Sequence, residues 1–156
     1  MYWLDLAAPR EAKLEQIDKL LRNVWLECCS HLSEFSAGQR EVSMATRTGD
    51  AFSSVGSRLE YVYDFGSSTE LVVSLSGIIE GHPGKAVRVV ARNEPPAWIC
   101  DVCGAPATAL CPECVYEGNG FCCAEHASSH ECGEDMLLPV VNSPRMGVCA
   151  YTGPAA

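Results

Sequence analysis

The feature that most constrains this chain is a cysteine-rich segment that runs from Cys100 to Cys132. It holds seven of the ten cysteines and two of the four histidines of the 156-residue sequence. Two C-x2-C motifs followed by a mixed group of cysteines and histidines are typical of a zinc site. Because so short a segment cannot bury enough apolar surface to fold alone, we expect bound metal to stabilise it.

The potential ligands of this segment fall into four pairs along the chain. They are Cys100 with Cys103, Cys111 with Cys114, Cys122 or Cys123 with His126, and His130 with Cys132. In the third pair, the C-x2-H spacing of Cys123 suits the tight turn of a zinc knuckle, whereas Cys122 gives the wider C-x3-H spacing. Four pairs supply eight ligands, and a tetrahedral Zn²⁺ ion takes four. The sequence therefore predicts two Zn²⁺ ions, with Cys123 preferred to Cys122.

Other uses of these cysteines have weaker support. A ribbon with one zinc ion would use only the first two pairs, but the segment between Cys103 and Cys111 is short for the hairpin of a ribbon. A redox C-x-x-C enzyme is not indicated, because no βαβ pattern surrounds either motif. A catalytic ion needs an open coordination position, whereas the surplus of ligands here indicates closed, structural sites.

The order of the four pairs is similar to that in the two-zinc cross-brace fingers of the MYND and HIT classes. In those fingers the first and third pairs share one ion, and the second and fourth pairs share the other. The resemblance implies one site made of Cys100, Cys103, Cys123 and His126, and another made of Cys111, Cys114, His130 and Cys132. The final H-x-C pair is tighter here than the H-x3-C pair of those fingers.

The charge and hydropathy of the chain argue against several classes of function. A net charge of −9 argues against a protein that binds the phosphates of nucleic acid, which requires an excess of Lys and Arg. No apolar stretch is long enough to cross a membrane, and the first residues lack the basic and apolar regions of a secretory signal. We therefore expect a cytoplasmic protein without membrane contact, in which paired cysteines bind metal rather than form disulfides.

The remaining sequence predicts an α+β fold, in which an antiparallel sheet packs with one main amphipathic helix beside a small C-terminal zinc-binding module. Apolar residues spaced three and four apart predict the helix over residues 10–29. The pattern further predicts strands over residues 2–6, 31–36, 59–65, 70–79 and 86–92, a loop over 37–55, and turns at 66–68 and 81–84. Two prolines at 95–96 favour a boundary. We expect an α+β domain over 1–94, a zinc module over 95–138, and a tail over 139–156 that packs back on the body.

Three residues at the end of the predicted helix could also carry chemistry. Adjacent helical residues point about 100° apart, so Cys28 and Cys29 cannot easily chelate one ion. We therefore interpret both as small buried hydrophobes, and His31 as a structural histidine. The alternative is that the ECCSH sequence, which ends at His31, makes an additional metal or redox site.

Several strings outside the cysteine-rich segment resemble the plasmid pRiA4b ORF-3-like family, in its version with a C-terminal Cys-rich zinc module. They are NVWLECCSHLSEF, YVYDFGSSTEL, ARNEPP and LPVVNSPRMGVCAYTG, and the resemblance covers at least residues 24–153. It implies a helix packed on an antiparallel sheet, and a function that is largely unassigned, although some members are labelled transposon passenger proteins. The family pattern includes the cysteines of LECC and GVCAYTG, which favours a role for Cys28, Cys29 or Cys149.

The chain contains neither a nucleotide-binding fingerprint nor a nucleophile elbow, so the sequence indicates no particular enzyme class. Asp64, Glu34 and Glu70 are the candidate acid–base residues, and Asp64 is more simply interpreted as a support for the hairpin turn that follows it. We therefore expect a non-catalytic protein-interaction module with structural zinc and an unknown protein partner. The alternative is a nucleic-acid-associated accessory protein of a mobile element. A weaker hypothesis is a small-molecule or hydrolase site near Asp64 and His31.

Overall fold

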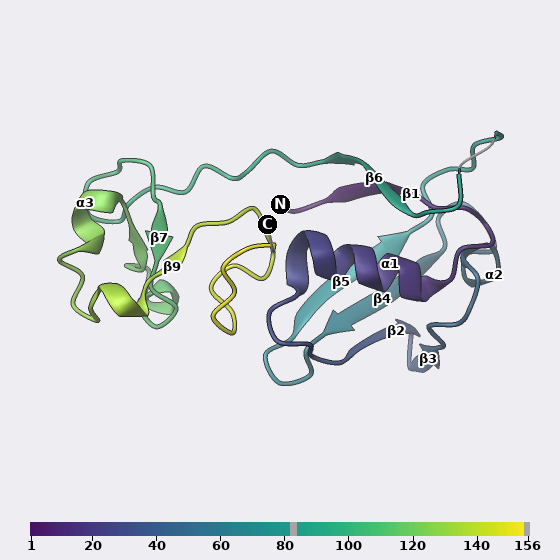
Figure 1. Cartoon of the computed structure of the whole chain (residues 1–156), viewed down its shortest axis with the longest axis horizontal. Helices are drawn as coiled ribbons and strands as arrows, with labels where there is room; N and C mark the ends of the chain where they lie inside the picture. The colour runs from purple at the N-terminus through teal and green to yellow at the C-terminus, as the bar shows by residue number, and fades with distance from the viewer. Residues whose placement is uncertain (82–83, 155–156) are drawn as a thin grey trace.

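A computed structural model of the chain describes residues 1–81 and 84–154. It shows an elongated α+β molecule with two parts (Figure 1). One part, here called the body, contains helix α1 (Leu14–Leu21) and a four-stranded antiparallel sheet; the other contains the cysteine-rich segment. The C-terminal segment, drawn in yellow, lies between the two parts. The predicted fold class is confirmed.

The sheet of the body has the strand order β3-β2-β4-β5, with every neighbour antiparallel. Its strands are β2 (Ser33–Ala37), β3 (Arg40–Val42), β4 (Arg58–Tyr63) and β5 (Thr69–Ser74). The register aligns Phe35, Tyr61 and Leu71 on the face that forms the core, since side chains alternate between the two faces of a sheet. Glu34 and Glu70 flank Val62 on the opposite face, away from the core.

Helix α1 buries Leu14, Ile17 and Leu21 against this sheet, as the apolar periodicity predicts. The chain then continues as a π-helical turn, η1 (Arg22–Leu26), which buries Trp25 and Leu26. Glu27 is already extended, so the predicted helix over residues 10–29 is wrong at its C-terminal end. Cys28 and Cys29 consequently lie in a loop and not on the helix.

A separate two-stranded ribbon lies beside the main sheet. It consists of β1 (Leu4–Ala7) paired antiparallel with β6 (Arg88–Arg92). The predicted loop over 37–55 instead contains β3 and the short helix α2 (Thr48–Ala51). The predicted strand over 70–79 ends early, at Ser74, and the predicted turn at 81–84 includes residues 82–83, which lie outside the described residues.

The part of the molecule that holds the cysteine-rich segment contains only short elements. Its three-stranded sheet has the order β8-β7-β9, with β7 at Ala109–Leu110, β8 at Phe121–Cys122 and β9 at Leu138–Pro139. Two 3-10 turns, η2 (Cys114–Glu117) and η3 (Glu134–Met136), and the helix α3 (Ala124–Ala127) complete it. Strands of two residues form too few ladder hydrogen bonds to hold a unit together without further support.

The C-terminal segment returns to the body through buried polar contacts. The Ser143 hydroxyl donates to the carbonyl oxygen of Trp25 at 2.7 Å, and Tyr151 is buried. The Arg145 side chain is fully buried and forms an ion pair with Asp64 at 2.6 Å. Within the described ranges, no helix is both long enough and apolar enough to cross a membrane.

Candidate metal centres

Among the described residues, three groups of four cysteine and histidine side chains could each hold a metal ion. In each group, the potential ligand atoms lie within 4.8 Å of one another. The first cluster is Cys100, Cys103, Cys123 and His126; the second is Cys111, Cys114, His130 and Cys132; the third is Cys28, Cys29, His31 and Cys149. Every cluster contains three thiols and one imidazole, and all ten cysteines of the chain are free.

The spacing of the first cluster matches tetrahedral coordination. Zn–S bonds of about 2.3 Å place two sulfurs about 3.8 Å apart, and a sulfur and an imidazole nitrogen about 3.5 Å apart. The Sγ atoms of Cys103 and Cys123 are 3.8 Å apart. The Nδ1 atom of His126 lies 3.2 Å from Cys123 Sγ and 3.6 Å from Cys100 Sγ. An ion placed among these atoms would therefore need only small shifts of its ligands.

Backbone geometry prepares the first cluster for a metal. Gly104 adopts a left-handed φ of 73°, which lets its N–H donate to the Cys100 carbonyl at 2.9 Å and closes the knuckle. The backbone N–H groups of Cys123 and Cys103 lower the pKa of the Cys100 thiol to about 6, although burial opposes them. Cys100 is therefore largely a thiolate near neutral pH, and the thiolate is the form that binds metal.

The ligands of the second cluster come from the residue after β7, from η2 and from the turn that follows α3. The Sγ atoms of Cys114 and Cys132 are 3.5 Å apart. Burial raises the pKa of the Cys111 thiol, but the Cys114 N–H and the His130 ring bring it down to about 7. The Nε2 atom of His130 is buried, and nothing in the described part of the chain hydrogen-bonds to it. A metal ion would satisfy this otherwise unpaired nitrogen.

Cys122 lies outside both of these clusters. It is buried in β8, with its sulfur 3.9 Å from the Gly120 carbonyl oxygen and 3.7 Å from Nδ1 of His130. Successive residues of an extended chain point to opposite sides, so Cys122 faces the interior while Cys123 joins the first cluster.

The four sequence pairs are interleaved in space. The pair Cys100 and Cys103 lies with the third pair, and the pair Cys111 and Cys114 lies with the fourth. A ribbon with one ion would instead bring the first two pairs together, which is not the arrangement found. All eight residues predicted as metal ligands fall within the first two clusters.

The third cluster joins residues that lie far apart in the sequence. Cys28, Cys29 and His31 come from the loop after η1, and Cys149 comes from the C-terminal segment. Because the helix ends before Cys28, the two neighbouring thiols are free to converge, and their Sγ atoms are 3.5 Å apart. The interpretation of Cys29 as a buried hydrophobe is wrong, since its side chain is exposed. The sequence held a partial signal, because all three cysteines that lie outside the cysteine-rich segment belong to this cluster, together with His31.

Asp64 lies directly beside the third cluster. Its carboxylate accepts the Gly66 N–H at 2.9 Å, as expected of a residue that supports a turn. It also pairs with Arg145, and it faces Nδ1 of His31 at 3.6 Å. The Arg145 guanidinium lowers the pKa of Asp64 to about 2, so this carboxylate stays ionised at neutral pH and is poorly suited to acid–base catalysis.

Comparison with known proteins gives no match to any family model, curated protein or solved structure. The function of the chain therefore has to be inferred from its own geometry. That geometry supports a metal-binding protein with three clusters of three thiols and one imidazole each.

Proposed function

We propose that residues 95–138, which include the cysteine-rich segment, form a protein-interaction module whose shape is maintained by two structural Zn²⁺ ions. The observation that carries this proposal is the interleaving of two clusters with four protein ligands each. Four ligands fill a tetrahedral shell, so no position remains for a substrate or an activated water. The ions would hold a surface in shape and would not act on a bound molecule.

The donor atoms favour zinc. Thiolate sulfur and imidazole nitrogen in a tetrahedral arrangement suit Zn²⁺, whereas Mg²⁺ and Ca²⁺ require oxygen ligands. Each ion would join two ligand pairs that lie apart in the sequence, in a module whose strands are only two residues long. Zinc binding of this kind contributes on the order of 10 kcal/mol to folding in peptide models.

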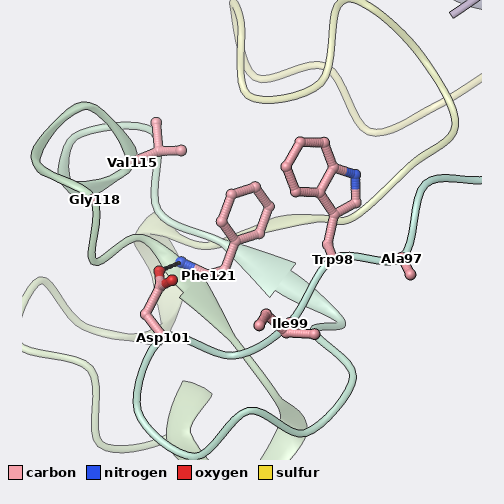
Figure 2. Close-up of a pocket in the computed structure, with 7 residues that line it drawn as sticks. All are labelled: Ala97, Trp98, Ile99, Asp101, Val115, Gly118 and Phe121. Atoms are coloured by element: carbon pink, nitrogen blue, oxygen red, sulfur yellow. Dashed lines mark hydrogen bonds between the residues drawn. The ribbon is translucent and has the colours of Figure 1, made fainter. Parts of the chain in front are cut away.

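An apolar hollow beside the first cluster offers a place for a partner. Its volume is about 310 Å³. Figure 2 shows the rings of Trp98 and Phe121 lying parallel above Ile99; their centroids are 4.6 Å apart and their planes differ by 7°. Ile99 is 59% exposed, although it borders these rings. Asp101 supplies the one charged side chain of the lining, and its carboxylate accepts the Phe121 N–H at 2.7 Å.

The charge of the module indicates which partner would fit. Residues 93–144 contain no Lys or Arg, whereas the module carries seven acidic residues: Asp101, Glu113, Glu117, Glu125, Glu131, Glu134 and Asp135. Three thiolates outweigh the charge of one Zn²⁺, so each loaded site adds further negative charge. We therefore propose a basic protein segment that places one apolar side chain in the hollow. The same charges oppose contact between this module and nucleic-acid phosphates.

The test is a binding assay on the full-length, zinc-loaded protein. Three fluorescein-labelled peptides share one length: a central Leu flanked by Lys, the same Leu flanked by Glu, and a central Ser flanked by Lys. Fluorescence polarisation should show binding only of the first peptide, weakened by added salt. Ile99→Asp should abolish that binding, and Val90→Asp, a matched change at an exposed apolar residue of β6, should not.

Three results would contradict the proposal. One is equal binding of the Leu peptides with Lys and Glu flanks, and another is binding that Ile99→Asp leaves unchanged. The third is a lack of binding by any of the peptides together with tight, steeply salt-dependent binding of a DNA duplex, which would favour a nucleic-acid function.

A further inference from the structure

We infer that Cys28, Cys29, His31 and Cys149 bind a third Zn²⁺ ion, which fastens the C-terminal segment to the body of the fold. This inference goes beyond the proposed function and does not depend on it, because none of the four residues belongs to the cysteine-rich segment. It assigns a structural role to the cysteines that remain after the module has been accounted for.

The first argument is the spacing of the four ligand atoms. Cys29 Sγ lies 3.5 Å from Cys28 Sγ and 3.5 Å from Cys149 Sγ. Nε2 of His31 lies 3.1 Å from Cys29 Sγ and 3.3 Å from Cys149 Sγ. These separations are close to the roughly 3.8 Å and 3.5 Å of tetrahedral zinc with sulfur and nitrogen ligands. The cluster therefore resembles the first two in both donor set and geometry.

The second argument is the orientation of the His31 ring. Its Nε2 atom faces the sulfurs, while Nδ1 faces Asp64 Oδ1 at 3.6 Å. Metal-binding histidines usually direct their second nitrogen to a carboxylate or a carbonyl, which fixes the ring and its tautomer. Arg145 in turn holds the other oxygen of Asp64 at 2.6 Å. Asp64 is thus a positioning residue for the proposed ligand.

The third argument is the charge that the fold places against the cluster. The guanidinium of Arg145 is fully buried, and its Nη2 lies 3.6 Å from Cys28 Sγ. The Tyr63 ring packs against the same guanidinium, with 4.9 Å between Arg145 Cζ and the ring centroid. A zinc ion with three thiolates carries a net negative charge, and a buried cation beside one sulfur stabilises such a centre.

The fourth argument is the way the local backbone is held. Arg22 donates to the His31 carbonyl at 2.7 Å and pairs with Glu27 at 3.0 Å, which fixes the loop that carries three ligands. Within residues 1–81 and 84–154, the non-glycine residues with positive φ are Ser30, Asp64, Cys149 and Ala150. Cys149 is itself a ligand of the cluster, Ser30 and Ala150 are next to ligands in the sequence, and Asp64 contacts the ligand His31. Such conformations cost energy, and they concentrate at sites where they serve a function.

Because Cys149 lies in the C-terminal segment, the proposed ion would attach this segment to the body. The C-terminal segment lies between the module and the body (Figure 1). It is already joined to the chain before the module by a hydrogen bond from the Asn93 side chain to Asn142 Oδ1 at 2.8 Å. An ion shared by Cys149 and the loop after η1 would close this segment onto the body and limit the motion of the module.

The test starts with zinc analysis of the full-length protein under reducing conditions by inductively coupled plasma mass spectrometry. The wild type should contain three zinc ions per chain, one for each cluster. Cys149→Ser and Cys29→Ser, both changes at exposed positions, should each contain two. Cys122→Ala is the matched control, because it removes a thiol that belongs to no cluster, and it should keep three.

Hydrogen exchange then separates this ion from those of the module. Cys149→Ser should speed exchange in residues 27–32 and 139–154 and leave residues 100–132 protected. Cys132→Ser should instead speed exchange in residues 100–132 and leave residues 27–32 and 139–154 protected. Asp64→Asn should weaken one of the three ions by about 10–100-fold in a chelator competition and leave the other two unchanged.

Each of four results would overturn the inference. Two zinc ions in the wild type, or three in Cys149→Ser, would exclude the third site. A disulfide between Cys29 and Cys149 that persists in protein purified under reducing conditions would show that these cysteines pair with each other and do not bind metal. Loss of one zinc ion in Cys149→Ser without faster exchange of the C-terminal segment would show that the third ion does not attach this segment to the body.

Discussion

Replacement of Arg145 by methionine should be among the most damaging single changes outside the cysteine-rich segment. Arg145 is fully buried and joins the C-terminal segment to three oxygen acceptors: Asp64 at 2.6 Å, the Ser67 carbonyl at 2.8 Å and the Thr69 hydroxyl at 3.1 Å. Methionine fills part of the volume but leaves a buried carboxylate without its cation. Breaking a buried ion pair by removing one partner costs about 3–5 kcal/mol, and we expect Arg145→Met to lower the free energy of unfolding by that amount.

Urea unfolding of the zinc-loaded protein, followed by circular dichroism, measures this change, since urea does not screen charges. Arg92→Met is the control: Arg92 also donates to the C-terminal segment, at the Asn142 carbonyl, but from an exposed position, so its loss should cost under about 1 kcal/mol. The double variant Asp64→Asn/Arg145→Met should cost less than the sum of its two single changes. A cost below about 1 kcal/mol for Arg145→Met, or strict additivity in the double variant, would refute the reasoning.

Three further predictions concern the module and the same ion pair. Removal of zinc by a chelator under reducing conditions should abolish hydrogen-exchange protection over residues 97–138, while the core around α1 keeps its protection. Equal protection of residues 97–138 and of that core after zinc removal would contradict this prediction. Gly120→Ala should weaken zinc binding by the second cluster in a chelator titration, because its Cβ would lie 2.5 Å from Val115 backbone atoms in η2, whereas Gly77→Ala, with open space around its Cβ, should not. Arg145 lowers the pKa of Asp64 to about 2, against about 4 in an unfolded chain, so the carboxylate stabilises the fold above pH ~4 and loses this effect as the pH falls toward 2. The difference in unfolding free energy between wild type and Asp64→Asn, with chelator in both samples, should shrink over that window, and a difference that stays constant would contradict it.

Features that depend on nearby residues could be predicted from the sequence. The spacing of Leu14, Ile17 and Leu21 predicts the buried face of α1, because helical periodicity is a local property. The alternation of Leu59 and Tyr61 predicts β4 in the same way. The C-x2-C motifs predict the metal module, since both ligands of each pair lie within one turn of the chain.

Features that depend on distant residues could not be predicted in this way. Cys149 meets Cys29 across 120 residues, and Arg145 meets Asp64 across 81, so no local pattern reports either contact. The apolar period continues through Cys28 and so does not predict the end of the helix at Leu26, where a π-helical turn buries Trp25. The domain boundaries and the resemblance to the plasmid pRiA4b ORF-3-like family stay predictions.

The most direct test of the central claim is to identify which cysteines share each ion. In protein reconstituted with ¹¹³Cd²⁺, a ¹¹³Cd–¹H correlation spectrum connects each metal to the β-protons of its cysteine ligands. We expect one cadmium bonded to Cys100, Cys103 and Cys123, and a second bonded to Cys111, Cys114 and Cys132. The third should be bonded to Cys28, Cys29 and Cys149. A single cadmium bonded to Cys100, Cys103, Cys111 and Cys114 would contradict the interleaved arrangement on which the account depends.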